Sequence, residues 1–300
     1  MAAELDTRID LYTKAAEDTA SGIIRLYSTS FGLASRLLEP QCRRHIENIY
    51  SLVRLADEVV DGVASEAGVA DSEARDLLDR LEADTQRALE TGYSTNLIVH
   101  AFAHSARQLG IGMDLVAPFF ASMRADFDKV EHDQESFELY VYGSAEVVGL
   151  MCLQAFLVDH SVSDAERETM VRGARALGAA FQKVNFLRDL AVDFEALGRS
   201  YFPGVTPDSL DEETKHRLLD DIDQDLELSA KALPLLPARP RRAVALAHAL
   251  FDELGRQIRR TPAEDVMSSR ASVPGWRKTT LALWVLAGGL PSAPVRVTNA

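Results

Sequence analysis

Two pairs of aspartates are the residues of this chain best suited to do chemistry. Asp57 and Asp61 lie four residues apart, and Asp189 and Asp193 repeat that spacing. Residues four apart share one face of a helix, so each pair would place two carboxylates one helical turn apart. Two such faces around a pocket would supply four hard oxygen donors, the type of ligand that Mg²⁺ prefers.

An arginine accompanies each aspartate pair. Arg54 lies three residues before Asp57, and Arg188 immediately precedes Asp189. Guanidinium groups make bidentate, charge-assisted contacts with phosphate oxygens, and Mg²⁺ commonly binds through one or two carboxylates together with substrate phosphates. The combination predicts magnesium and diphosphate chemistry, in which the cations neutralise the charge that develops on a departing diphosphate.

The residues around both aspartate pairs are mostly apolar. Like charges four apart cost about 0.2–0.5 kcal/mol on an exposed helix, and burial raises that cost unless a cation or a donor is present. For either pair alone, the alternative is a set of surface charges or arginine–aspartate ion pairs. The occurrence of both pairs, each with its arginine, favours a functional site.

The elements that must position these residues are helices. Apolar residues recur at three- and four-residue spacing over ten ranges: 4–20, 41–61, 73–90, 95–109, 112–130, 137–158, 163–196, 212–232, 238–260 and 276–288. Turn signals such as Gly62, Gly92 and Pro203-Gly204 separate them. These helical ranges predict an all-α fold. No linker rich in Gly, Ser or Pro divides the chain, so a single domain over 1–300 is predicted, with a catalytic core over about 20–290.

Three local features complete the helical pattern. Ser163-Asp164 and Asp208-Ser209 precede helical ranges and are predicted to supply N-caps. The acidic run from Asp208 to Glu227 is expected to form a solvated helix face. The proline-spaced stretch from Pro234 to Pro240 is expected to turn one helix into the next.

Composition excludes several function classes. The net charge of −14 argues against a nucleic-acid binder, which would carry a basic face. Two cysteines without a CxxC pair favour a reducing compartment, and the N-terminus lacks a secretory signal, so a cytoplasmic location is expected. No GxGxxG fingerprint is present, so no NAD(P)H site is expected. His100 and His104 have the spacing of a metal pair, but no glutamate follows His100, and both are interpreted as core or lining residues.

The C-terminal segment from Thr279 to Leu290 is strongly apolar and follows Arg277 and Lys278. Its length falls short of the roughly 20 residues that span a bilayer. A core helix is one interpretation. The other is an interfacial segment with Trp276 and Trp284 at headgroup level, which would give peripheral association with the inner face of the membrane.

At five places, in order, the chain resembles the squalene/phytoene synthase family, the head-to-head prenyl diphosphate synthases. The matching segments are Tyr27-Ser-Thr-Ser-Phe-Gly32, Ile49 to Gly62 with the first aspartate pair, Tyr140 to Gly149, Gln182 to Asp193 with the second pair, and Arg199-Ser-Tyr-Phe-Pro203. The resemblance runs from about Tyr27 to Leu290, and the first two segments are most similar to bacterial phytoene synthases.

This resemblance implies the isoprenoid synthase fold, with helices around a central cavity that carries the two aspartate motifs. It also implies a two-step coupling of two prenyl diphosphates, through a cyclopropylcarbinyl diphosphate, with Mg²⁺ as cofactor and Mn²⁺ as an alternative. Two C20 geranylgeranyl diphosphates would give phytoene. The alternatives are a C15 dehydrosqualene or presqualene diphosphate synthase and, more remotely, a non-catalytic family member that serves assembly or interaction. Downstream carotenoid enzymes are expected partners of the C20 enzyme.

The resemblance also assigns roles to individual residues. It places the metals on Asp57, Asp61, Asp189 and Asp193. It places diphosphate near Tyr50, Arg54, Gln182, Asn185 and Arg188, and adds Ser28, Ser30, Phe31, Tyr140 and Tyr201 as pocket residues. Phe31 and Tyr140 are the first candidates for stabilising a cationic intermediate, by about 0.5–2 kcal/mol each, with simple core packing as the alternative for both.

Three positions depart from the family pattern. Val192 stands where an acidic residue usually precedes the final aspartate of the second motif. The segment around Glu131-His132 lacks the Arg-Tyr pair expected there, and Ala247 stands near a position where relatives often carry tyrosine. These differences bear on the details of the substrate pocket more than on the class of reaction.

Overall fold

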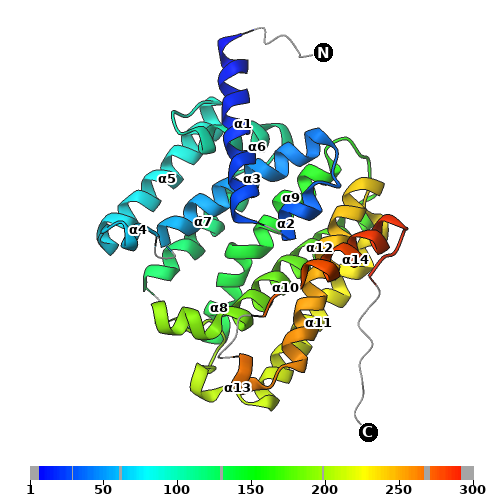
Figure 1. Cartoon of the computed structure of the whole chain (residues 1–300). Coiled ribbons are helices and arrows are strands. Elements are labelled where there is room, and N and C mark those ends of the chain that lie inside the picture. The colour runs from blue at the N-terminus through cyan, green and yellow to red at the C-terminus, as the bar shows by residue number, and fades with distance from the viewer. Residues whose placement is uncertain are drawn as a thin grey trace. The chain divides into compact units, whose positions relative to one another are not determined.

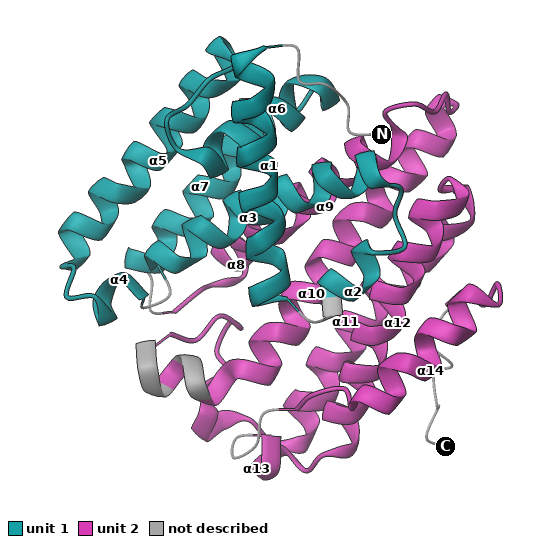
Figure 2. Cartoon of the chain, turned by 45° about the horizontal axis from the view of Figure 1, so that its top comes forward, with its two compact units in different colours: residues 1–127 teal, residues 128–300 magenta. Residues whose placement is uncertain are grey.

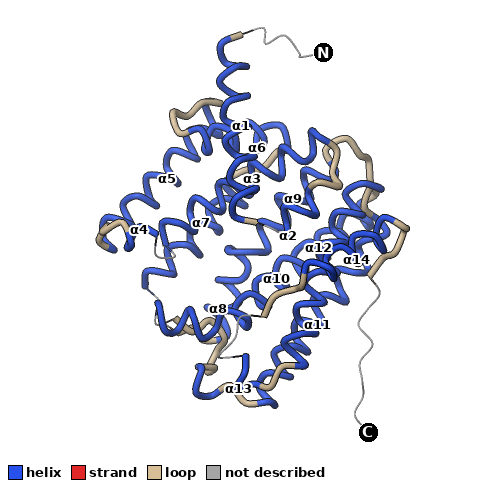
Figure 3. Tube along the Cα trace, viewed as in Figure 1, coloured by secondary structure: helices blue, strands red, loops and turns tan. Residues whose placement is uncertain are grey.

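The structure is a computed structural model that describes residues 7–28, 30–60, 63–128, 131–197, 199–266 and 271–291. Asp61 lies outside these ranges, and the side chains of Ser30, Val192 and Asp193 are also outside the described part. All regular elements of the described residues are helices, accompanied by one isolated bridge between Glu131 and Ser200 (Figure 3). The all-α prediction is confirmed.

The chain divides into two compact units, residues 1–127 and 128–300 (Figure 2). The helices of the first unit are α1 (Arg8–Tyr27), α2 (Ser30–Ser35), α3 (Pro40–Val60), α4 (Val63–Glu66), α5 (Asp71–Thr91), α6 (Leu97–Leu109) and α7 (Met113–Asp128) (Figure 1). Each long predicted range lies on one of these helices. However, α1 continues seven residues past the predicted end at residue 20, and α2 and α4 were not predicted.

The regular elements described in the second unit are also helices. It contains α8 (Gln134–Val141), a π-helical turn η1 (Tyr142–Glu146), α9 (Val147–Leu157), α10 (Asp164–Leu197), η2 (Pro207–Ser209), α11 (Glu212–Ala232), η3 (Leu233–Leu235), α12 (Ala238–Arg260), α13 (Ala263–Val266) and α14 (Gly275–Leu286). The predicted ranges 212–232 and 238–260 coincide with α11 and α12. The proline-spaced stretch does turn one into the other, through η3.

The core of the first unit is formed where α1, α3 and α6 pack together. The buried face of α3 carries Ile49, Leu52 and Ala56, each at most 2% exposed. A buried polar contact adds to this packing, because Ser105 on α6 lies 2.9 Å from both His45 Nδ1 and Asn48 Nδ2 on α3. Contacts with α6 on the buried face of α3 therefore help to fix the helix that carries the first aspartate motif.

The core of the second unit is organised by α10, which packs against η1, α9, α11 and α12. Two glycines bring backbones into direct contact. A Cβ added at Gly178 on α10 would lie 2.6 Å from the carbonyl oxygen of Ala145 in η1, and one at Gly149 on α9 would overlap the carbonyl of Ala174 on α10. The π turn and α9 therefore approach α10 at a distance that only glycine permits at these two positions.

One described stretch, Gln134–Leu157, passes a length-and-hydropathy test for a membrane-spanning helix. This stretch is α8, η1 and α9 together. Half of its apolar window is buried inside the structure, and the stretch packs on α10. Buried core helices pass the same test, so the stretch is described as the apolar core helix of the second unit.

The acidic run on α11 is not simply solvated, as the sequence had suggested. Asp221 and Asp225 accept hydrogen bonds of 2.6 and 2.8 Å from Lys183 Nζ on α10. On the other side, Arg259 on α12 pairs with Asp220 and Asp223 at 2.9 and 2.8 Å. The charges of α11 bridge it to both neighbouring helices, because Lys183 and Arg259 reach its surface.

One predicted cap is correct and the other is displaced. The Ser163 hydroxyl accepts from the backbone amide of Glu166 at 3.3 Å, and the Glu166 carboxylate accepts from the Ser163 amide at 3.0 Å, which caps α10. The cap of α11 is Asp211, which accepts from the Thr214 amide at 2.8 Å, rather than Asp208-Ser209. Pro207 starts a short 3-10 turn that places those two residues before the helix.

The C-terminal helix α14 is a surface helix instead of the core helix that composition had suggested as one alternative. Val285 is its one buried residue, and α14 packs on α12, where Arg277 pairs with Glu253 at 3.0 Å. Its large exposed apolar side chains are Trp276, Leu283, Trp284 and Leu286, which are 41–69% exposed. Packing against α12 uses too little of the helix surface to cover them.

Candidate active site

The first aspartate motif lies on the half-buried edge of α3. Tyr50, Arg54 and Asp57 follow one another at four- and three-residue spacing, and all three are half-buried. Ile49, Leu52 and Ala56 of the same helix turn into the core, which orients the polar positions along one edge of the helix. Asp61, one further turn along the sequence, is outside the described residues.

Arg54 is already engaged by two neighbours. Its Nε donates to Glu58 Oε1 at 2.6 Å and its Nη2 donates to the same oxygen. Its guanidinium lies over the ring of Tyr27, 4.5 Å from the centroid, at the end of α1. Burial lowers the pKa of Arg54, but the hydrogen bond that it donates to Glu58 and the charge of Asp57 outweigh burial and raise the pKa. The guanidinium is thus cationic and fixed against an aromatic face.

Tyr50 contacts the segment of residues 27–32, the entry segment, which precedes α3. Its ring stacks on Phe31 of α2, with centroids 5.7 Å apart and planes 21° apart. Burial raises the pKa of Tyr50, as does the charge of Asp57, although Arg54 and a side-chain hydrogen bond with Ser28 oppose the shift. Tyr50 therefore remains a neutral phenol, and the sequence-predicted residues Ser28, Phe31 and Tyr50 lie together.

The second aspartate motif occupies one edge of α10. Gln182, Asn185 and Asp189 are half-buried, while Val184 and Leu187 between them are fully buried. Arg188 contacts its neighbour Asp189 directly: its Nε donates to Oδ1 at 2.9 Å, and its Nη2 donates to Oδ2. Gln182 and Asn185 make no side-chain hydrogen bond with the other described residues.

An aromatic cluster lies beside the second motif, and only Tyr140 and Tyr201 of this cluster were predicted as pocket residues. Phe186 of α10 stacks on Tyr201 with centroids 4.0 Å apart and planes 8° apart. Tyr140 of α8 packs 5.2 Å from Tyr201 and 5.1 Å from the ring of His132. The bridge between Glu131 and Ser200 fixes the segments that carry His132 and Tyr201 side by side. Tyr140 and Tyr201, both predicted as pocket residues, are thus in one cluster.

Three neighbours of the predicted residues were missed. Glu58 could have been found, because its position four residues after Arg54 is the spacing of a helical ion pair. His132 was noted only as a departure from the family pattern, and nothing in the local sequence shows that it packs on Tyr140 and Tyr201. Phe186 was read only as an apolar neighbour of Asp189. Its stacking on Tyr201 depends on a fold contact between distant segments.

The donor chemistry of both edges suits a hard divalent cation, since each presents a half-buried carboxylate, Asp57 or Asp189, beside a cationic arginine. No group of three or more His, Cys, Asp or Glu side chains that could hold a metal occurs among the described residues. Asp61 and the carboxylate of Asp193 lie outside this part of the chain. The metal assignment of the four aspartates stays a prediction.

Comparisons with known proteins agree with the motifs. The family model described as squalene/phytoene synthase matches residues 24–277. A phytoene synthase of Pseudescherichia vulneris is 29% identical over 252 residues, which are 77% of this chain and 79% of that protein. A bifunctional lycopene cyclase/phytoene synthase of Leptosphaeria maculans is 28% identical over 85% of this chain, but the chain spans only 48% of that protein's length.

A solved structure, that of a dehydrosqualene synthase in complex with ligand, has the same fold. It aligns with a TM-score of 0.74 at 22% identity, over 93% of this chain and 98% of that one. Because the family model covers most of the chain, including both aspartate motifs, membership follows from it directly. The chain belongs to the squalene/phytoene synthase family and is an enzyme of the prenyltransferase type.

Proposed function

We propose that this enzyme is a phytoene synthase, which couples two geranylgeranyl diphosphates head to head in a Mg²⁺-dependent reaction. The observation that carries the proposal is the pair of half-buried aspartate–arginine edges, on α3 and α10, in the motif order of the family. The two relatives described above both carry phytoene synthase in their names, which favours the C20 reaction.

In the proposed first step, one substrate loses diphosphate to give an allylic cation, and the double bond of the second substrate attacks it. Loss of a proton then closes a cyclopropane that retains the second diphosphate. In the second step that diphosphate leaves, the carbon skeleton rearranges, and loss of another proton gives the hydrocarbon. Each step therefore releases one diphosphate and one proton.

The residues of this chain would act on the diphosphate and on the cation. Asp57, Asp61, Asp189 and Asp193 would hold Mg²⁺, which supplies positive charge to the departing diphosphate. Arg54 and Arg188 would donate charge-assisted hydrogen bonds to its oxygens.

Other residues would orient and protect the reacting groups. Tyr50, Gln182 and Asn185 would orient the diphosphate, with Ser28 and Ser30 at the entry segment. The faces of Phe31, Tyr140 and Tyr201 would stabilise the carbocation by roughly 0.5–2 kcal/mol each and exclude water from it. No residue of this set calls for NAD(P)H.

The C15 reaction is the second candidate, since the dehydrosqualene synthase shares the fold at 22% identity. Incubation of the pure protein with farnesyl or geranylgeranyl diphosphate, with Mg²⁺ or with EDTA, separates the two. A C40 hydrocarbon formed only with Mg²⁺ is expected. A C30 product would instead assign the C15 reaction, and failure of both substrates to react would favour the non-catalytic alternative.

The location proposed for the enzyme is the cytoplasm, with peripheral contact at the inner face of the membrane. The exposed side chains of Trp276, Leu283, Trp284 and Leu286 on α14 support this contact, and a lipid-soluble product would make it useful for transfer to downstream carotenoid enzymes. Replacing both tryptophans with serine should abolish sedimentation with liposomes at unchanged helicity. If the variant sediments with liposomes as much as the unaltered protein does, the proposed membrane contact of α14 is wrong.

A further inference from the structure

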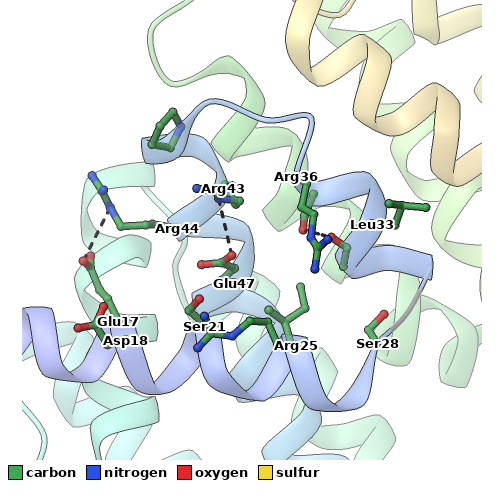
Figure 4. A pocket seen from close by; sticks show the side chains of 14 residues that line it. Glu17, Asp18, Ser21, Arg25, Ser28, Leu33, Arg36, Arg43, Arg44 and Glu47 are labelled. Carbon is green, nitrogen blue, oxygen red and sulfur yellow. Dashed lines mark hydrogen bonds and ion pairs between the residues drawn. The ribbon is translucent and has the colours of Figure 1, made fainter. Parts of the chain in front are cut away.

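A charged cavity lies within the first unit, apart from the aspartate edge of α3. It has a volume of about 590 Å³, within the range of about 300–1,000 Å³ usual for small-molecule sites. Its walls come from α1, from α2 and from the first half of α3, and every lining residue belongs to the first unit. Figure 4 shows the charged side chains around this space, which come from α1, from α3 and from Arg36 just after α2. None of the predicted metal ligands lines it.

Arginine is the dominant residue of this cavity, which is unexpected in a chain with a net charge of −14. The cavity contains Arg25, Arg36, Arg43 and Arg44. Two of these face carboxylates: Arg43 Nε lies 3.8 Å from Glu47, and Arg44 Nε lies 3.8 Å from Glu17. Both separations exceed hydrogen-bond distance, so neither guanidinium has its donors fully committed.

The other two arginines leave the cavity with an excess of positive charge. Arg25 and Arg36 are exposed and form no ion pair with any other residue of the described part. The third carboxylate of the cavity, Asp18, lies 3.5 Å from Lys14, so it does not compensate them. Arg25 interacts electrostatically with Glu47 but forms no ion pair with it in the described part of the chain. All four arginines line this one cavity, with Arg44 turned toward Glu17 and Arg36 at the other side, just after α2 (Figure 4).

We propose that this cavity is a binding site for a phosphate-class polyanion, either free diphosphate or the phosphate headgroup of a lipid, and that binding needs no metal ion. Guanidinium forks match the geometry of phosphate oxygens, and at this site arginines, not carboxylates, dominate the charge. The inference goes beyond the proposed function and does not depend on it. Binding at this site should persist in EDTA, whereas the aspartate edges require Mg²⁺ to hold diphosphate.

The position of Ser28 suggests how the site would communicate with the reaction. Ser28 lines the cavity and is also the hydrogen-bonding partner of Tyr50. A polyanion held by Arg25 and Arg36 would therefore lie next to the segment that contacts the ring of Tyr50. Binding of a polyanion in the cavity should therefore change the surroundings of the Tyr50 side chain as well as those of the arginines.

The test is titration calorimetry of the full chain in EDTA with three probes: sodium diphosphate, geranyl diphosphate, and phosphatidic acid in phosphatidylcholine vesicles. We expect saturable binding of at least one probe. The double variant R25Q/R36Q should weaken it by about tenfold or more for each arginine lost, as for charge-assisted hydrogen bonds. Binding of diphosphate identifies a free polyanion, and binding of vesicles alone identifies a lipid headgroup.

Two controls separate this site from other sources of binding. R80Q removes an exposed arginine of the same unit, on α5, and should bind like the unaltered protein. D57N should also bind the probes in EDTA, even though it abolishes turnover. Probe binding therefore tests this site, and turnover separately tests the proposed reaction. Absence of saturable binding for all three probes, or equal binding by R25Q/R36Q and R80Q, would overturn the proposal.

Discussion

The aspartate edges of α3 and α10 contain the same residue types but use their arginines differently. On α3, Arg54 donates twice to Glu58, a carboxylate outside the predicted metal set. On α10, Arg188 donates twice to Asp189, a predicted metal ligand itself. A cation that binds Asp189 must therefore compete with Arg188, and that competition would release the guanidinium for phosphate oxygens. On α3 the arginine is held by a separate carboxylate.

The two helices are also supported differently. The described part of α10 approaches its neighbours through glycines, with Gly178 against η1 and Gly149 of α9 against Ala174. The sequence of α3 contains no glycine, and it is held by apolar side chains and by the contacts of Ser105 with His45 and Asn48. The position of α10 should accordingly be sensitive to a single added methyl group, whereas α3 should tolerate small changes.

The largest expected effect is loss of turnover when either edge loses its first aspartate. D57N and D189N should each lower kcat by about 10²–10³-fold or more, because stabilisation of developing charge of this kind contributes that much. Helicity by circular dichroism should not change. D76N, at an exposed position of α5, should retain normal turnover. Near-normal activity of D57N or D189N would remove that edge from the site.

The second effect is on stability and tests the glycine contacts of α10. G178A places a Cβ 2.6 Å from a backbone oxygen that cannot move by itself, so the free energy of unfolding should fall by about 1–3 kcal/mol. G255A on α12 is the matched control, since a Cβ there meets nothing within 4 Å. It should stabilise by about 0.5–1 kcal/mol through helix propensity. Denaturant midpoints measure both, and equal shifts would disprove the proposed tight contact.

Much of this arrangement could be predicted from the sequence, because long amphipathic helices carry a strong local signal. The spacing of Tyr50, Arg54 and Asp57 was sufficient to place them on one edge of α3. The π turn was missed, since one extra residue per turn barely alters the apolar pattern and the turn is fitted to Gly178. The extension of α1 to Tyr27 was also missed, and with it the ring beneath Arg54.

The partners of charged residues were harder to predict than the helices. The acidic residues of α11 appeared to be solvated because nothing near them in sequence neutralises them. Lys183 lies 38 and 42 residues from Asp221 and Asp225, so the pairing requires the packing of α10 on α11. Ion pairs within one turn, such as Arg54–Glu58, are encoded locally. Pairs between helices depend on the tertiary fold, which residue spacing does not specify.

A smaller effect should distinguish the two arginines. R188Q removes the competitor for Asp189, so the Kd for Mg²⁺ in the absence of substrate should fall by about fivefold, the equivalent of about 1 kcal/mol. E58Q alters the contact of Arg54 and should leave this Kd within about twofold. Calorimetric titration with Mg²⁺ compares the variants directly. Equal constants for R188Q and the unaltered protein would show that the Arg188–Asp189 contact does not limit metal binding.

The last expected effect concerns acid stability and depends on a buried histidine of the second unit. His248 Nε2 donates to the carbonyl oxygen of Leu226 at 3.0 Å, and its buried Nδ1 has no partner among the described residues. Burial lowers the pKa of His248, although the hydrogen bond that it donates to the Leu226 carbonyl opposes the shift. The unfolded chain therefore binds a proton first as the pH falls below about 6.5, the usual pKa of histidine.

It follows that the free energy of unfolding should be constant above about pH 7 and should decrease below about pH 6.5. The contribution of His248 is at most about 1.4 kcal/mol per pH unit. H248Q retains a donor for the Leu226 carbonyl but cannot titrate, so its stability should fall less steeply between about pH 6.5 and 5. H160Q, at an exposed position, should keep the original slope. If H248Q and H160Q lose stability in parallel, the acid sensitivity does not arise from His248.

Buried carboxylates would not explain it either. Burial raises the pKa of Asp225, for example, despite the charge of Lys183. A carboxyl with a raised pKa takes up its proton in the folded state first, so it would oppose the loss of stability rather than cause it.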